Sequence, residues 1–248
     1  MKHILNIKRS TSHLMLYGEL GRFPISLTIK IRQISFWSKL VSNEESKLSL
    51  IMYRLLYNNH IRNNCQYGWI TKIKSIFEET GLNFMWMNQN INTHTIRNQI
   101  GSILKDQFRQ KWHQDVDASS KCCNYKIFKT EHKFETYLIK LPHFYLKQFI
   151  NYRLCNNKLP IETGRWNGVD RHLRKCTLCN DEVGDEYHYV FNCKSFDTDR
   201  KRIAPFINKR LANTQTFSYY FNDENIVRLK KTCSLLALIL KRFSTPGS

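Results

Sequence analysis

Four residues of the kinds that bind metal ions fall within 18 positions, and they constrain the fold of this chain more than any other feature. They form the array C-x2-C-x8-H-x4-C, which consists of Cys176, Cys179, His188 and Cys193. Three thiolates and one imidazole are a common closed ligand set for Zn²⁺, which prefers four ligands in a tetrahedron. A C-x-x-C pair places two thiolates on one tight turn, the usual first half of such a site. The array therefore predicts one zinc ion per chain.

Two other interpretations of the array stay open at this point. One is chance spacing of reduced cysteines, and the other is a redox-active C-x-x-C pair, which needs a βαβ frame that the sequence does not indicate. A Cys3His zinc site has no open coordination position, so it is structural rather than hydrolytic. Its four ligand atoms should lie roughly 3–4 Å apart, as bonds of about 2.0–2.3 Å require. The remaining cysteines should take no part: Cys65, Cys122, Cys123, Cys155 and Cys233.

The residues around the histidine predict a short helix over 185–191. Asp185 and Glu186 stand at its N-terminus, where the helix dipole favours carboxylates, and either could accept the free imidazole N–H. Positions i and i+5 do not share a helix face, so the chain must leave this helix before Cys193. Asn192 suits that turn, because Asn tolerates the left-handed backbone region.

The charge balance predicts a polyanionic partner. Lys and Arg number 39 against 20 Asp and Glu, which gives a formal net charge of +19. Residues 1–175 hold 28 basic and 12 acidic side chains, so most of the excess, +16, precedes the cysteine array. Nucleic acid is the usual partner of such a chain, and a merely solvated surface is the alternative.

Basic residues flank the zinc loop, while the loop itself is acidic. Between Cys176 and Cys193 there are four carboxylates and no Lys or Arg. We therefore predict that zinc fixes the local geometry and that the flanks contact phosphate. The alternative is that both flanking clusters are solvated helix ends. The predicted nucleic-acid contacts are Arg171, Arg174, Lys175, Arg200, Lys201 and Arg202.

Apolar residues recur at helical spacing along most of the chain, which predicts a mainly α fold. The expected architecture is an irregular multi-helix bundle with a small Cys3His zinc-binding insert. Residues 25–34 alternate at period two and could form a strand, but we favour one helix over 25–41. Further helices are expected after a capping box at 42–45, and over about 69–80, 93–113, 142–154 and 224–242.

Caps and faces follow from the same patterns. Asn92 or Thr93 is expected to cap the long central helix, and Asp223 or Asn222 the last one. The helix after the capping box should bury a stripe made of Leu48, Ile51, Met52, Leu55 and Leu56. Polar joints divide the chain into four expected segments: 1–24, a helical basic domain over 25–165, a zinc-binding segment over 166–202 and C-terminal helices over 203–248.

A membrane partner is not expected. The longest apolar run, residues 235–240, is far too short to span a bilayer. The N-terminal residues lack the apolar core of a secretory signal. We therefore expect an intracellular chain, in which thiols stay reduced.

Enzyme activity is not expected either. Polymerase metals need clustered carboxylates, commonly an Asp-Asp pair, and no such pair occurs. Asp199-Arg200-Lys201 provides only half of a restriction-type nuclease motif. No Gly-rich phosphate loop or nucleophile signature appears.

The zinc array and several shorter blocks resemble one known family. The Gly184-Asp185-Glu186-x-His188 run is similar to the C-terminal cysteine-histidine region of non-LTR (LINE-type) retrotransposon reverse transcriptases from invertebrates. The resemblance covers most of the chain, and the array is its most specific part. Other similar blocks are residues 17–24, 36–37, 119–121, 125, 128–129 and 159–165.

The resemblance implies a region downstream of the polymerase that binds template RNA or target DNA in the nucleus. It also implies a truncated protein without the polymerase or endonuclease domains, in which residues 1–24 are a remnant of the segment after the thumb. Two classes of function remain. One is a zinc-containing nucleic-acid-binding module, and the other is a structural or protein-interaction remnant that binds no nucleic acid.

Overall fold

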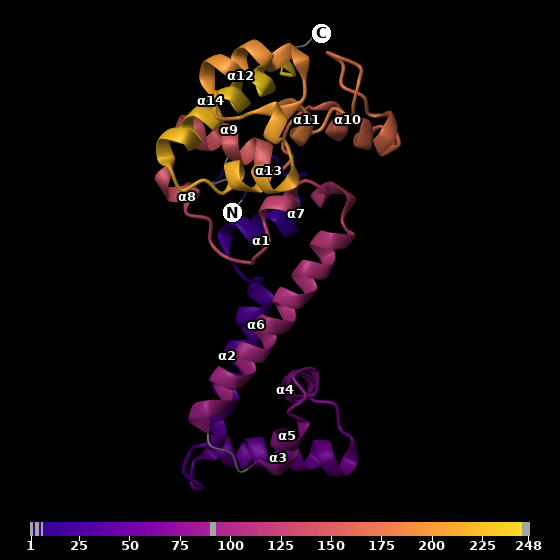
Figure 1. Ribbon diagram of the computed structural model, residues 1–248. Coiled ribbons are helices and arrows are strands. Elements are labelled where there is room, and N and C mark those ends of the chain that lie inside the picture. Colours follow the sequence, from indigo (N-terminus) through magenta and orange to yellow (C-terminus); the bar gives the residue numbers. More distant parts are fainter. Residues whose placement is uncertain (1, 3–4, 6, 90–92, 245–248) are drawn as a thin grey trace. The chain divides into compact units, whose positions relative to one another are not determined.

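The computed structural model describes residues 2, 5, 7–89 and 93–244, and these form fourteen α-helices, four 3-10 turns and no β-strand (Figure 1). This confirms the mainly α class predicted from the hydrophobic spacing. None of the described helices combines the length and the apolar character that crossing a bilayer requires. The chain divides into two compact units, Phe23–Trp112 and a second unit made of Met1–Arg22 with His113–Ser248. The second unit therefore combines residues from the start of the chain with its C-terminal half.

The Phe23–Trp112 unit is built from helices whose apolar faces meet around an aromatic core. The Trp37 ring meets Phe77 edge-on at 4.9 Å between centroids, and its indole N–H donates to the Tyr53 hydroxyl at 2.8 Å. Residues 25–34 are helical, which confirms the favoured alternative for that segment. The helices are α2 (Ile25–Val41), α3 (Leu48–Asn63), α4 (Gly68–Glu79), α5 (Asn83–Asn88) and most of α6 (Thr93–Ala118).

Helix α3 departs from the prediction at its start and in the face it buries. The capping box at 42–45 is wrong, since α3 begins after Lys47 and no side chain caps it. The predicted stripe is also wrong, because the buried residues of α3 are Leu50, Tyr53 and His60. Tyr53 determines the face, because it packs against Trp37 and hydrogen bonds within the aromatic core. Four of the five predicted stripe residues are exposed: Leu48, Ile51, Met52 and Leu55.

The second unit contains the cysteine array and most of the helices. In its core, α14 packs against α9 and α12, and α13 packs against α7. The Phe221 ring stacks against Phe128 and Phe149, at centroid distances of 5.0 and 5.5 Å. Its helices are α1 (His13–Leu20), α7 (Tyr125–Phe128), α8 (Tyr137–Lys140), α9 (His143–Arg153), α10 (Pro160–Trp166), α11 (Glu186–Phe191), α12 (Asp197–Ile203), α13 (Thr214–Phe221) and α14 (Ile226–Arg242). Its 3-10 turns are η1 (Ser120–Cys122), η2 (Arg171–Leu173), η3 (Lys194–Phe196) and η4 (Lys209–Leu211).

A fully buried ion pair joins α1 to α9 in this unit. The Arg153 Nε lies 3.0 Å from Glu19 Oε2, and both side chains are 0% exposed. Arg153 also donates to the Phe221 carbonyl at 2.6 Å, and the Tyr137 hydroxyl donates to Glu19 at 2.6 Å. Because a buried charge is costly unless it is paired and hydrogen bonded, these contacts specify how α1, α9 and α13 pack.

The predicted ends of three other helices can be compared directly. Helix α9 begins after Pro142, as predicted, and Thr93 is the first residue of α6 rather than its cap. The alternative cap, Asn92, lies outside the described residues. Neither residue predicted to cap α14 does so, because the Asn225 side chain accepts the Val227 and Arg228 amides instead.

Candidate metal centre

The four predicted ligands converge in the structure. One ligand atom each from Cys176, Cys179, His188 and Cys193 lies within 4.8 Å of all the others. The Cys176 and Cys193 sulfurs are 3.8 Å apart, and the Cys179 sulfur is 3.4 Å from His188 Nε2. A tetrahedral zinc with the usual bond lengths places its ligand atoms roughly 3.5–3.8 Å apart. These two separations match that geometry, and the four donors together could hold one metal ion.

A tight backbone turn carries the first two cysteines. The amide of Cys176 donates to the Glu182 carbonyl at 2.8 Å, and Lys175 and Val183 form an antiparallel bridge. The Leu178 amide points at the Cys176 sulfur, 3.4 Å away. Asn180 closes the turn with a φ of +58°, in the left-handed region that Asn tolerates. The turn therefore directs both thiols to the same side.

The prediction placed the left-handed Asn at the wrong end of the loop. Asn192 has φ −103° and ψ −30°, which is right-handed backbone. The chain leaves α11 because the Asn192 and Cys193 amides both donate to the His188 carbonyl, at 2.8 and 2.9 Å. This double contact turns the chain so that Cys193 returns to the group of donors.

A carboxylate orients the histidine ring, but it is not one of the two that were predicted. His188 Nδ1 lies 2.9 Å from Glu182 Oε2, and the side-chain amide of Asn192 donates to the same oxygen at 2.9 Å. Because the carboxylate accepts the Nδ1 proton, Nε2 presents its lone pair to the cysteine sulfurs. Hydrogen bonds from His188 and Asn192 also lower the pKa of Glu182. Glu182 is therefore the outer partner of the site.

The two predicted carboxylates have other contacts. Asp185 caps α11, accepting the His188 amide at 3.0 Å, which confirms the short helix. Its other oxygen pairs with Arg171 at 2.8 Å. Glu186 accepts a hydrogen bond from the Asn124 side-chain amide at 2.8 Å.

The thiols differ in how readily they ionise. Burial raises the pKa of Cys176, but the Tyr189 hydroxyl and the Leu178 amide beside its sulfur bring the pKa down to about 7. Burial raises the pKa of Cys193, and the neighbouring Cys176 thiolate raises it further. Cys176 is therefore the more acidic of these two thiols, and a cation between the sulfurs would offset the repulsion that raises the pKa of Cys193.

The basic residues before the array have mixed environments. The Arg174 guanidinium donates to the Val169 carbonyl at 2.8 Å and to the Ile161 carbonyl at 3.1 Å, so it braces the loop. Arg171 pairs with Asp185 and is half exposed. Lys175 is exposed and lies beside the turn that carries the cysteines.

The basic residues after the array also differ from one another. Arg200 is 4% exposed and donates to the carbonyls of Val190 at 2.7 Å and Cys193 at 3.2 Å. Lys201 is exposed, and Arg202 is exposed and pairs with Asp199 at 2.8 Å. Sequence reasoning missed the internal role of Arg200, because a basic residue among basic neighbours gives no sign that it is buried.

A second group of donors lies buried near α11. One ligand atom each of Cys155, Glu162 and Glu186 lies within 4.8 Å of the others. Burial, followed by the neighbouring Glu162, raises the pKa of Glu186 to about 7. Lys121 and Arg165 both contact Glu162 and supply the positive charge that a metal would otherwise bring. Nothing in the sequence predicts this group, because Glu186 is far along the chain from Cys155 and Glu162 and the three form no metal-binding motif.

No protein-family model matches this chain, and no curated protein and no solved structure shows significant similarity to it.

Proposed function

We propose that this chain is a zinc-stabilised nucleic-acid-binding module. The observation that carries the proposal is the convergence of Cys176, Cys179, His188 and Cys193 within 4.8 Å, inside a chain of net charge +19. The metal would hold the loop, and the basic surface would meet the polyanion. The similarity to the C-terminal region of non-LTR retrotransposon reverse transcriptases supports the same proposal and favours an intracellular, nuclear setting.

Zinc suits the donors better than other common metals. Three thiolates and an imidazole are soft or borderline ligands, and a tetrahedral set of this kind is typical of structural zinc. The Glu182 carboxylate behind the imidazole is the second-layer partner that zinc-bound histidines usually have. With all four positions filled by protein, the metal would have a structural rather than a catalytic role.

Nucleic acid suits the charge better than other partners. A chain with this excess of Lys and Arg attracts polyanions, and phosphate contacts account for most non-specific nucleic-acid binding. Lys175, Lys201 and Arg171 present exposed or half-exposed charge on both sides of the array. We therefore assign binding to RNA or DNA backbone rather than to particular bases.

One observation favours the second candidate, a structural or protein-interaction module. Arg174 and Arg200 donate to carbonyls within the chain, so these two guanidinium groups support the fold. Under this alternative the exposed lysines serve only solubility, and the zinc loop serves only stability.

A gel-shift series on the zinc-loaded protein decides between the two candidates. The binding constant for RNA and DNA should fall steeply with salt, by a slope of about 0.7–0.9 per phosphate contact. Cys179→Ser should weaken binding by loosening the loop, whereas Cys123→Ser, outside the donor group, should not. If zinc-loaded protein binds neither nucleic acid at low salt, the module is structural and the proposal is wrong.

A further inference from the structure

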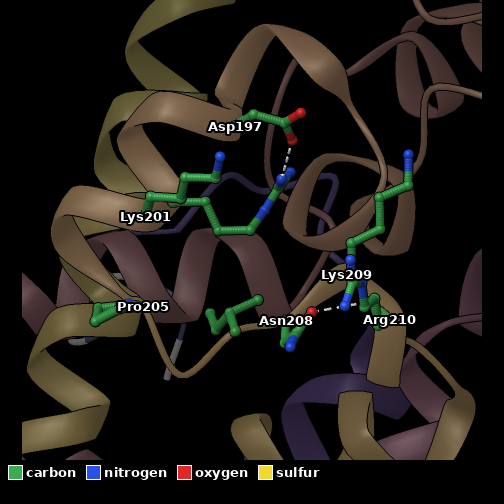
Figure 2. A pocket seen from close by; sticks show the side chains of 8 residues that line it. Asp197, Lys201, Pro205, Asn208, Lys209 and Arg210 are labelled. Atoms are coloured by element: carbon green, nitrogen blue, oxygen red, sulfur yellow. Dashed lines mark hydrogen bonds and ion pairs between the residues drawn. The ribbon is translucent and has the colours of Figure 1, made fainter.

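A groove with a basic rim lies between α12 and the segment that follows it (Figure 2). Its volume is about 660 Å³, within the range of sites that hold small ligands or ligand fragments. Lys201 reaches it from α12, and Lys209 and Arg210 reach it from the segment after Pro205. Two of these three residues lie beyond the basic flanks that the sequence singles out.

The charge of the groove is positive once internal pairs are taken into account. Asp197 is the one carboxylate among the lining residues, and Arg200 pairs with it at 2.5 Å. That pair is neutral overall, and the Arg200 guanidinium also donates to the Val190 and Cys193 carbonyls. Lys201, Lys209 and Arg210 are exposed, so the groove keeps three positive charges.

The lining also indicates which part of a polyanion would fit. Pro205 and the buried Ile207 are the apolar residues of the lining, and none of the lining residues is aromatic. A positively charged groove without aromatic side chains suits the phosphate backbone, whereas base recognition on a single strand uses aromatic stacking. The chemistry therefore favours the sugar-phosphate backbone, which carries no sequence information.

The groove is joined to the metal centre through the backbone next to Cys193. Arg200 donates to the Cys193 carbonyl at 3.2 Å, and Lys209 Nζ lies 3.5 Å from the Asn192 carbonyl. Helix α12 follows the last ligand after only the η3 turn. A metal that fixes Cys193 thus also fixes the wall from which Lys201 extends.

We propose that this groove is the main phosphate-binding site of the chain. Lys201, Lys209 and Arg210 bind the phosphates of a nucleic-acid strand there. The inference rests on the proposed function. It assigns the main contact between the chain and nucleic acid to the segment that follows Cys193. It predicts binding that tolerates changes of sequence and falls steeply with salt.

The test compares two triple variants that remove the same charge. One is Lys201→Gln, Lys209→Gln and Arg210→Gln, and the control replaces three exposed lysines of the same unit elsewhere. Binding of a mixed-sequence single strand and of its duplex is measured over a range of salt. In the groove variant the slope of the logarithm of the binding constant against the logarithm of salt concentration should decrease in magnitude by about 2–3, because each lost phosphate contact removes about 0.7–0.9. The control residues are Lys140, Lys147 and Lys158.

A second readout keeps the assignment independent of folding. The oligonucleotide should protect Lys201 and Lys209 from acetylation in the wild-type protein, and both triple variants should unfold at the wild-type urea concentration. If the wild-type protein binds but the groove variant keeps the wild-type slope, the groove assignment is overturned while the proposed function stands. If the wild-type protein binds no nucleic acid, both are overturned. An equal loss in the control would also overturn the groove assignment.

Discussion

Arg200 provides a sharp test of how this unit is held together, because its neighbours in the sequence suggest a different role. We consider Arg200→Met, which keeps an apolar stem but removes the guanidinium. The substitution removes the hydrogen bonds that Arg200 donates to the Val190 and Cys193 carbonyls. The Val190 carbonyl lies in the last turn of α11, where helix carbonyls have no partner within the helix. Arg202→Met is the matched control, since the Arg202 side chain is 69% exposed and pairs with the nearby Asp199.

The expected loss follows from these contacts. A hydrogen bond that involves a charged group contributes about 1.5–3 kcal/mol, so two such bonds at the low end are worth about 3 kcal/mol. The ion pair to Asp197 adds less than about 1 kcal/mol, because that carboxylate is 46% exposed. Arg200→Met should therefore shift the unfolding equilibrium by about 100-fold. Arg202→Met should cost no more than about 1 kcal/mol.

Urea unfolding and amide hydrogen exchange of the zinc-loaded protein measure these effects. Arg200→Met should lower the unfolding midpoint and speed exchange in α11 and α12, and it should weaken metal retention because Cys193 loses an anchor. Arg202→Met should leave the unfolding midpoint, the exchange rates in α11 and α12 and the metal retention close to those of the wild type. An Arg200→Met protein that unfolds like the wild type but loses salt-dependent oligonucleotide binding would refute the structural role and make Arg200 a phosphate contact.

Three further predictions concern single residues. Glu182→Ala should lower metal affinity about 10–100-fold in a competition titration with a chelator, because the imidazole loses its orienting carboxylate, whereas Asp181→Ala should have little effect. Arg153→Met should cost about 3–5 kcal/mol in urea unfolding, because it leaves a buried carboxylate unpaired, and a loss under about 1 kcal/mol would contradict that account. Gly21→Ala should destabilise the fold by more than about 1 kcal/mol, since Gly21 has φ +56° and its added Cβ would lie 2.4 Å from a neighbouring backbone nitrogen. Gly68→Ala, which meets nothing within 4 Å, should be nearly neutral, and equal effects at the two glycines would refute the argument.

The sequence predicts the convergence of the four Cys and His donors well, because their spacing along the chain is short. Four donors within 18 positions leave few ways to fold the loop, and the structure brings all of them together. Helix α4 was equally predictable, since Ile70, Ile73 and Phe77 repeat at helical spacing and Gly81 ends the helix with φ +71°. Both predictions depend on contacts between residues close in the chain.

The errors arise where distant parts of the chain decide the outcome. The aliphatic residues of α3 repeat at helical spacing, yet Tyr53 faces the core because its hydroxyl meets Trp37 and Gln89. Similarly, the sequence offered several carboxylates for the imidazole, and the turn closed by Asn180 selects Glu182. Hydrophobic spacing indicates that a helix has a buried face, and residue types indicate that a histidine has a carboxylate partner. Tertiary contacts determine which face is buried and which carboxylate pairs with the histidine.

Zinc in a closed Cys3His site has a coordination signature that can be measured in the purified protein. X-ray absorption at the zinc edge, together with metal analysis of freshly purified reduced protein, should give about one zinc per chain. It should also show three sulfur neighbours at about 2.3 Å and one nitrogen at about 2.0–2.1 Å. Cys179→Ser should reduce the sulfur count or release the metal, and Cys123→Ser should change neither. Protein without zinc, or zinc bound mainly by oxygen and unaffected by Cys179→Ser, would contradict the account.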